Sequence, residues 1–235
     1  VTEDNTNYSS TDGVLYNKKK KTLIKKKKKK TSIEIPNSVI NIGNSAFEGC
    51  SSLTNIEIPN SVTNIGNNAF EGCSSLTNIE IPNSVTNIGM HLTHESRVFE
   101  GCEALKYHKY DNGLYLGNKD NPYAFLIKAK TKDITSCLID EECYNIASDA
   151  FNGCWRLTNI EIPDSVTTIG SGAFDGCEAL TNIDVAEDNA NYASIDGALF
   201  DKEKKILICS PESKTTLKIP LSVTKIEDVG RSLKN

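Results

Sequence analysis

A phrase of 23 residues recurs almost letter for letter through this chain. Residues 56–78 read IEIPNSVTNIGNNAFEGCSSLTN, and residues 33–55 are nearly identical to them. Further copies begin at Ile79 and Ile160. A fixed period of this length is typical of a solenoid, in which each unit stacks on its neighbour and cannot bury its apolar face alone. We therefore expect a repeat protein whose core is a continuous series of thin layers.

The apolar positions within the phrase divide it into a strand and a return. Ile56 and Ile58 alternate with polar neighbours, as a half-buried strand requires. Pro59 ends that strand because proline cannot donate to a ladder, and Val62 and Ile65 point back inward. The AFxGC phrase predicts a short helical or 3₁₀ return on the far side, with buried rings at Phe47, Phe70, Phe99, Phe151 and Phe174.

The cysteines follow the same register. Cys50 and Cys73 lie 23 residues apart, as do Cys154 and Cys177. One cysteine per turn at one register indicates packing, because a free cysteine behaves as a small buried hydrophobe. Disulfides remain an alternative, since stacked equivalents are about 5 Å apart. The absence of a CxxC pair argues against zinc, and we expect no metal and no cofactor. The cysteines assigned to the core are Cys50, Cys73, Cys102, Cys137, Cys143, Cys154 and Cys177.

The pattern LTxIxIPxSVTxIGxxAFxxC resembles the BspA-like leucine-rich repeat found in bacterial surface proteins. The resemblance covers nearly the whole chain. It implies an elongated, gently curved, right-handed solenoid with a parallel sheet on one face. It also implies a secreted or surface-attached module that binds or adheres and has no catalytic activity.

The register also explains the irregular segments. Residues 1–36 align without gaps to residues 185–220, which predicts a hairpin-type unit with strands at 13–16 and 22–24, and again at 197–200 and 206–209. We predict a single leucine-rich-repeat solenoid over 1–235, as a fragment of a longer surface protein. Regular repeats occupy 33–89 and 146–184, hairpin-type units occupy 1–32, 107–139 and 185–217, and residues 90–98 are an insertion.

The charge is unevenly distributed. The formal net charge is -5, but ten of the 26 basic residues lie between Lys18 and Lys30, so the rest of the chain is acidic. An acidic surface disfavours nucleic acid and anionic membranes as partners. The run from Lys25 to Lys30 has three interpretations, an anion-binding site, a solvated loop or an erroneous stretch of sequence. No apolar run reaches the ~18 residues of a membrane span, so we expect no membrane insertion.

Three groups of outward residues are candidates for binding. Glu34, Glu57, Glu80 and Glu161 share one register and should stack along the sheet, either as a consequence of repeat duplication or as an acidic stripe for a basic partner or a cation. Tyr107, Tyr110, Tyr115 and Tyr123 gather in the irregular middle, as an interface or as filler. His91 and His94 lie in the insertion, where HxxHE does not match the HExxH spacing of zinc hydrolases.

No catalytic motif accompanies these groups. The serines of the SVT phrase lie in repetitive turns, without a GxSxG elbow, and no phosphate-binding glycine loop is present. The sequence thus favours a non-enzymatic extracellular module that recognises a protein or glycan, on a host matrix or cell surface. The alternatives are a structural stalk that presents another domain and, less favoured, a hydrolase acting in the insertion.

Overall fold

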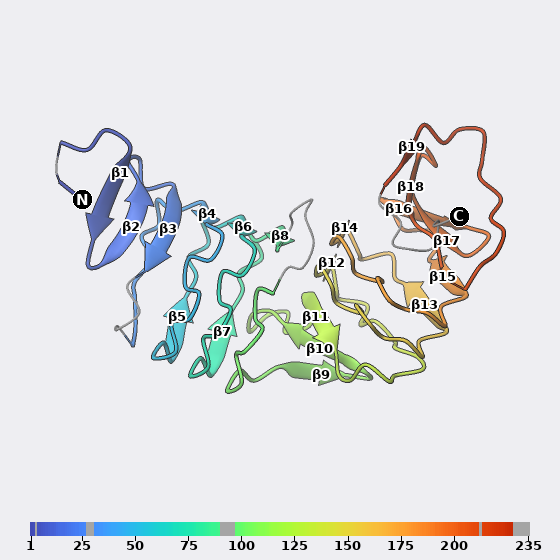
Figure 1. The fold of residues 1–235 in the computed structure, drawn as a ribbon, viewed down its shortest axis with the longest axis horizontal. Coiled ribbons are helices and arrows are strands. Elements are labelled where there is room, and N and C mark those ends of the chain that lie inside the picture. The colour runs from blue at the N-terminus through green and yellow to red at the C-terminus, as the bar shows by residue number, and fades with distance from the viewer. Residues whose placement is uncertain (3, 27–30, 90–96, 212, 228–235) are drawn as a thin grey trace. The chain divides into compact units, whose positions relative to one another are not determined.

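A computed structural model describes residues 1–235 apart from 3, 27–30, 90–96, 212 and 228–235. All regular elements of this described part are strands, without a helix among them, and so without one that is long and apolar enough to cross a membrane (Figure 1). The chain divides into two compact units, 1–107 with 116–122 and 108–115 with 123–235. The predicted solenoid is confirmed in each unit, whereas one continuous solenoid over 1–235 stays a prediction.

The N-terminal unit begins with a hairpin layer and continues as stacked parallel strands. Its six-stranded sheet has the order β1-β2-β3-β4-β6-β8, antiparallel as far as β3 and parallel beyond it. β5 and β7 form a separate parallel pair. The strands are β1 Tyr8–Thr11, β2 Val14–Asn17, β3 Thr22–Lys26, β4 Asn41–Ile42, β5 Asn55–Glu57, β6 Asn64–Ile65, β7 Asn78–Glu80 and β8 Asn87–Ile88.

The C-terminal unit repeats this plan and ends on a second hairpin layer. Its sheets have the orders β14-β12-β11-β10-β9, β13-β15 and β16-β17-β18-β19. The strands are β9 His108–Tyr110, β10 Gly113–Leu116, β11 Phe125–Ala129, β12 Asn145–Ile146, β13 Asn159–Ile162, β14 Thr168–Ile169, β15 Asn182–Val185, β16 Tyr192–Ile195, β17 Ala198–Asp201, β18 Ile206–Cys209 and β19 Lys225–Ile226.

The stacked turns of the solenoid, here called coils, pair at the spacing of the sequence repeat. Ile56 lies opposite Ile79 in the β5–β7 pair, and Ile42 lies opposite Ile65 in the β4–β6 pair. Each regular coil therefore contributes to two parallel ladders, where the sequence predicted one. Ile65 points inward as expected, and it does so from a two-residue strand that the sequence did not predict.

The return is not the helical or 3₁₀ segment that the sequence predicted. Its backbone N–H groups alternate between two kinds of partner. Phe47 and Gly49 donate to Ala69 and Glu71 in the next coil, over 2.7 Å each, whereas Cys50 donates locally to Phe47 over 2.9 Å. Ser45 and Gly49 have φ angles of 54° and 63°, and this left-handed backbone interrupts any continuous helix. The return is thus a run of turns that bonds to its neighbour.

Hydroxyl side chains join successive coils at the SVT phrase. Ser61 donates to the carbonyl oxygen of Val39 over 2.6 Å, and Ser84 donates to that of Val62 over 2.7 Å. Ser165 makes the same bond to Cys143 over 2.7 Å. These serines satisfy backbone carbonyls of the preceding coil, which explains why the phrase keeps a serine in each copy.

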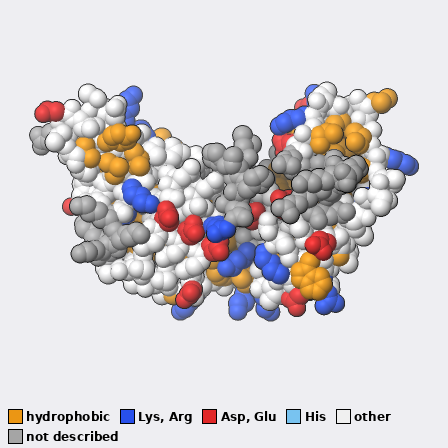
Figure 2. Space-filling view, in the orientation of Figure 1, with side chains coloured by type: hydrophobic (Ala, Val, Ile, Leu, Met, Phe, Trp, Pro, Cys, Tyr) orange, Lys and Arg blue, Asp and Glu red, His pale blue; other side chains and the backbone are white. Residues whose placement is uncertain are grey.

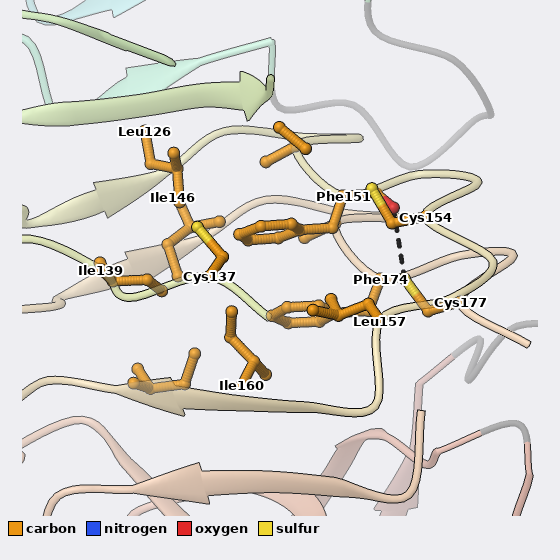
Figure 3. Packing of buried hydrophobic residues seen from close by; sticks show 14 of the residues in the cluster. Leu126, Cys137, Ile139, Ile146, Phe151, Cys154, Leu157, Ile160, Phe174 and Cys177 are labelled. Carbon is orange, nitrogen blue, oxygen red and sulfur yellow. Dashed lines mark hydrogen bonds between the residues drawn. The ribbon is translucent and has the colours of Figure 1, made fainter. Parts of the chain in front are cut away.

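The core consists of layers of aliphatic, aromatic and sulfur-containing side chains. In the C-terminal unit Phe151 stacks on Phe174 with ring centroids 5.7 Å apart (Figure 3). In the N-terminal unit Phe70 stacks between Phe47 and Phe99, at 5.0 and 5.6 Å. All five rings are buried. Each coil therefore covers the apolar face of the next, as the repeat requires.

Two-residue turns join the first two strands of each hairpin layer. Asp12 and Gly13 have φ angles of 51° and 80° between β1 and β2, and Asp196 and Gly197 have 51° and 73° between β16 and β17. Positive φ at both central residues is the type I′ geometry that two-residue hairpins favour. The strand pairs expected at 13–16 with 22–24 and 197–200 with 206–209 are confirmed, and β1 and β16 add a strand to each.

Candidate functional site

The outward glutamates of the strand face form a ladder. Glu34 pairs with Glu57 in a parallel bridge, and Glu57 lies opposite Glu80 in the β5–β7 pair. All three side chains are exposed. In the other unit Glu161 lies opposite Asp184 in the β13–β15 pair. The predicted register therefore holds for these residues, and each of these five coils presents one carboxylate on this face.

A second row of carboxylates follows the returns. Glu48, Glu71 and Glu100 occupy the same position of three successive coils, because Gly49 and Gly72 donate to the carbonyl oxygens of Glu71 and Glu100. Lys25 pairs with Glu48 over 3.3 Å, and Arg97 pairs with Glu100 over 3.2 Å. Figure 2 shows acidic side chains in a row on the visible face of the N-terminal unit. This row was not among the candidates from the sequence, although Glu48 and Glu71 lie 23 residues apart and Glu100 follows the next coil's insertion.

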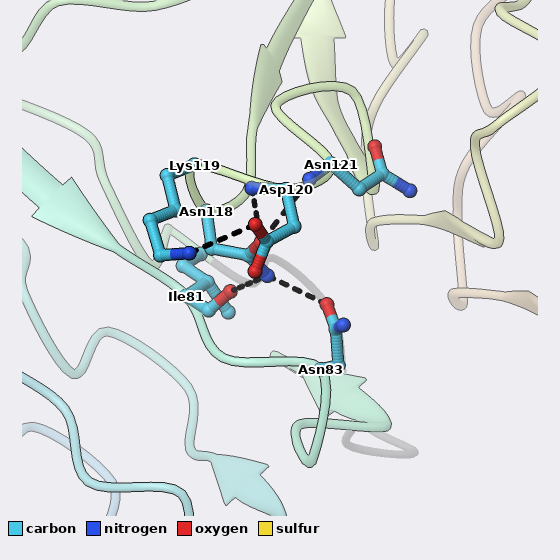
Figure 4. A network of polar contacts seen from close by, with 6 residues as sticks. All are labelled: Ile81, Asn83, Asn118, Lys119, Asp120 and Asn121. Carbon is cyan, nitrogen blue, oxygen red and sulfur yellow. Dashed lines mark hydrogen bonds and ion pairs between the residues drawn. The ribbon is translucent and has the colours of Figure 1, made fainter.

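A five-residue loop, 117–121, covers the end of the β5–β7 ladder. The Ile81 N–H donates to Gly117 over 2.8 Å, and the Asn118 side-chain amide donates to the Ile81 carbonyl over 3.1 Å (Figure 4). The oxygen of the same amide accepts from the backbone of Asp120 and Asn121. Lys119 bonds to Asp120 over 2.9 Å, and both Asp120 and Glu80 raise the pKa of its amine. The loop thus brings a cation to one end of the glutamate ladder.

The four candidate tyrosines do not form one group. Tyr107 belongs to the N-terminal unit, where burial raises the pKa of its half-buried phenol. In the C-terminal unit the Tyr123 ring contacts Tyr115 and Tyr110 edge-on, at centroid distances of 5.6 and 6.0 Å. It also contacts His108 at 6.1 Å.

Exposure differs among the rings of this aromatic cluster, which comprises His108, Tyr110, Tyr115 and Tyr123. Tyr115 is 0% exposed, and its hydroxyl accepts from the Asp140 N–H. Tyr110 is 38% exposed, and His108 is also exposed. Both come from β9, the edge strand of its sheet. A buried aromatic base therefore supports two rings that face solvent.

The remaining candidates are only partly covered by the described residues. His91 and His94 lie outside them, as do Lys27 to Lys30. Lys25 donates to the Ser45 carbonyl over 2.8 Å in addition to its pairing with Glu48. Lys26 is 3% exposed. The first two lysines of the run are thus engaged with the protein and do not extend freely into solvent.

The seven cysteines assigned to the core are buried and, like the half-buried Cys209, form no disulfide within the described residues. The thiols of Cys73 and Cys177 donate to the Phe47 and Phe151 carbonyls over 3.2 Å each. Burial raises the pKa of Cys137 and Cys143 to about 12. Within the described part of the chain no three His, Cys, Asp or Glu residues come together as a metal site requires. The thiols of Cys137 and Cys143 therefore stay protonated at neutral pH, and the buried cysteines serve packing.

A family model describes this repeat. The BspA type leucine-rich repeat region matches residues 21–119 and 121–228 in six copies. This chain belongs to the BspA-type leucine-rich repeat family. No curated protein sequence matches it.

Several solved structures are similar to this BspA-type chain. One is a leucine-rich cell surface protein from Faecalibacterium prausnitzii, with 24% identity and a TM-score of 0.43, covering 94% of this chain and 66% of that one. A leucine-rich repeat protein from Bacteroides ovatus has 27% identity and a TM-score of 0.40, with 98% and 55% covered. The pneumococcal vaccine antigen PcpA has 20% identity and a TM-score of 0.39, with 94% and 61% covered. The chain thus spans less than two thirds of each of these three.

One coil of this BspA-type chain departs from its repeat on the surface. The AFxGC phrase is followed by Ser51-Ser52 and by Ser74-Ser75, but by Trp155-Arg156 after Cys154. Trp155 is 51% exposed, and the Arg156 guanidinium carbon lies 5.4 Å from its ring centroid. This pair was not among the candidates from the sequence. Its signal was the single tryptophan at a position that other copies fill with serine or glutamate.

Proposed function

We propose that this chain is a non-enzymatic binding module of a cell-surface or secreted protein. It recognises a protein or glycan through side chains that the stacked coils hold outward. Family membership supports the general role, because leucine-rich repeats present extended surfaces. Among its relatives the Faecalibacterium prausnitzii protein is described as a cell surface protein, which supports the location.

The observation that carries the proposal is the aromatic cluster of the C-terminal unit. His108 and Tyr110 extend from β9 and are exposed, while Tyr123 and the buried Tyr115 hold them from behind. Rigid aromatic side chains lose little conformational entropy on binding, and interfaces are enriched in them. An edge strand that displays such rings is suited to shallow contact with a protein or glycan.

The glutamate ladder gives the strand face of the N-terminal unit a negative charge. One exposed carboxylate per coil, at Glu34, Glu57 and Glu80, repels an acidic partner and attracts a basic one. The ladder therefore selects among partners and speeds association more than it adds affinity. We propose this selecting role for the acidic stripe.

The proposal is tested by binding of the purified chain to arrays of glycans and matrix proteins. The matched variant replaces His108 and Tyr110 by serine, which leaves the buried rings in place. We expect specific capture by the unaltered chain and loss of most of it in the variant. Equal capture by both would remove the aromatic cluster from the proposal, and absence of any capture would contradict the binding function. Protease treatment of intact cells that produce the protein tests its surface location.

A structural stalk is the second candidate, and one observation favours it. Side-chain and backbone hydrogen bonds run from coil to coil along the stacking direction, as from Thr77 to Thr54 and from Ser84 to Val62. Such ladders resist extension of each unit. Force spectroscopy of the chain separates the candidates, because a stalk needs high unfolding force and no ligand.

A further inference from the structure

We propose that Trp155 and Arg156 form a binding platform for a neutral pyranoside sugar. The proposal rests on the binding function above and gives it a ligand class and a second location. The first observation is that the coil of Trp155 departs from the repeat. Five returns end in Phe-x-Gly-Cys, and an aromatic residue follows the cysteine only at Trp155. Its ring is 51% exposed in a chain that buries most of its large apolar side chains.

The backbone at Trp155 is fixed on both sides. Its carbonyl oxygen accepts from the Ala179 N–H of the next coil over 3.2 Å. Cys154, immediately before it, is buried, and so is Leu157 shortly after it. The exposed ring therefore projects from a rigid turn. A rigid aromatic anchor binds at low entropic cost.

The stacking of coils determines what surrounds the ring. One repeat earlier the equivalents of Trp155 and Arg156 are Lys132 and Asp133, and one repeat later Glu178 takes the tryptophan position. The Thr158 and Thr135 contact confirms this register, because the Thr158 N–H donates to the Thr135 carbonyl over 3.2 Å. All four charged side chains are exposed, so the ring lies among hydrogen-bonding groups.

The charges around the ring balance. Hydrogen bonds, first from Thr131, lower the pKa of Asp133, and the charge of Arg156 lowers it further, so the two charged side chains attract each other. Lys132 donates to the Asn152 carbonyl, and Glu178 supplies the second negative charge. Two positive and two negative groups offer little net attraction to an acidic or basic polymer. They do offer donors and acceptors to hydroxyl groups.

A neutral pyranoside has the matching chemistry. Its axial C–H groups make an apolar face that carries partial positive charge, and the face of an indole ring carries the opposite charge. Its equatorial hydroxyls reach sideways, where the guanidinium of Arg156 and the carboxylates of Asp133 and Glu178 form charge-assisted hydrogen bonds. A charged peptide would gain little from a patch whose charges balance, and an apolar peptide would need a deep apolar pocket.

The single tryptophan makes a direct test available. Selective excitation of Trp155 in the full chain reports only on this site while methyl glucoside, methyl galactoside, methyl mannoside and their neutral oligosaccharides are added. We expect a saturable change in emission with at least one of them, and little dependence on salt because the patch has no net charge. Oligoglutamate and oligolysine are the charged probes. A larger response to either, or no saturable response to any neutral sugar, overturns the proposal.

Other copies of the repeat supply the residues for a variant that removes the platform. Trp155→Ser with Arg156→Ser restores the serine pair of residues 51–52 and 74–75, so this double variant is expected to fold. Calorimetry should show sugar binding weakened at least about tenfold, as for other interface anchors. The matched control, Ser74→Ala with Ser75→Ala, should bind like the unaltered chain. Unchanged sugar binding in the double variant would refute the Trp155 site while leaving the proposed function intact, whereas loss of binding only in the His108 and Tyr110 variant would place the sugar at the aromatic cluster.

Discussion

The side-chain amide of Asn64 donates to the side-chain oxygen of Asn41, one coil earlier, over 2.8 Å. Asn87 makes the same bond to Asn64 over 2.9 Å, so the three amides form a ladder along the stacking direction. Asn64 is the middle member, acting as both donor and acceptor. Polar contacts of this kind fix the register of the coils, which the buried layers of similar aliphatic side chains specify only weakly.

Replacing Asn64 by alanine should therefore destabilise the N-terminal unit. The change removes the bonds to Asn41 and Asn87 and leaves their partly buried amides without a partner on one side. We expect a loss of about 1–3 kcal/mol, which a lowered urea midpoint would measure. Asn60→Ala, at an exposed position of the same coil, is the control and should shift stability by less than about 0.5 kcal/mol. Equal effects of the two changes would show that the ladder contributes nothing.

The sequence predicted the elements that its own periodicity describes. Ile56, Glu57 and Ile58 alternate, and the strand at that position follows from them alone. β6 is different, because Asn64 and Ile65 are too few to show a period and are held as a strand by the adjacent coils. The return was predicted wrongly for a related reason. Whether an N–H bonds within its coil or to the next one depends on stacking, which local helix propensity does not contain.

Other features were readable in the sequence and were overlooked. Asp12-Gly13 and Asp196-Gly197 are strong signals for two-residue hairpins, and they mark β1 and β16. Trp155 stands out once the copies are compared position by position. By contrast, the support of Tyr110 by Tyr123 across a loop of irregular sequence follows from the fold only. The sequence thus identified the tyrosines as candidates, but it could not predict which of their rings pack together.

The Phe70 ring should be the most sensitive aromatic position of the N-terminal unit. It stacks on Phe47 and Phe99 with interplanar angles of 1° and 3°, and it is fully buried. Phe70→Ala should cost about 3–5 kcal/mol, because the cavity interrupts a stack on both sides. Phe70→Leu fills most of the volume and should cost less. Thermal unfolding followed by circular dichroism measures both, and a Phe70→Leu variant as unstable as Phe70→Ala would contradict this explanation.

Removing one charge from the glutamate ladder should stabilise the fold at low salt. Glu57 lies between Glu34 and Glu80, and like charges that face each other across strands are unfavourable. Glu57→Gln should raise stability by about 0.2–1 kcal/mol, and the gain should shrink as added salt screens the repulsion. Glu80→Gln should raise stability by less than Glu57→Gln does, because Lys119 already interacts with Glu80. Denaturation curves at two salt concentrations decide this, and a gain that does not depend on salt would exclude charge repulsion as its cause.

The buried thiols should make stability depend on alkaline pH. Burial raises the pKa of Cys143 from 9.0 to about 12, so in the unfolded chain this thiol loses its proton roughly three pH units earlier. A group whose pKa is raised in the folded state stabilises the fold fully below the pKa of the unfolded state. That stabilisation is lost as the pH rises through the pKa of the folded state. The contribution of Cys143 is therefore intact below about pH 9 and disappears between about pH 9 and 12.

A variant isolates this effect from other alkaline titrations. Cys143→Ala removes the thiol, so its stability should fall less steeply with pH than that of the unaltered chain, by about 1.4 kcal/mol per pH unit between pH 9 and 12. Ile146→Val, in the same buried layer, lowers stability by a similar packing loss but carries no titrating group. Its curve should run parallel to that of the unaltered chain. Parallel curves for all three proteins would mean that Cys143 ionises equally in both states, and burial would then not govern its protonation.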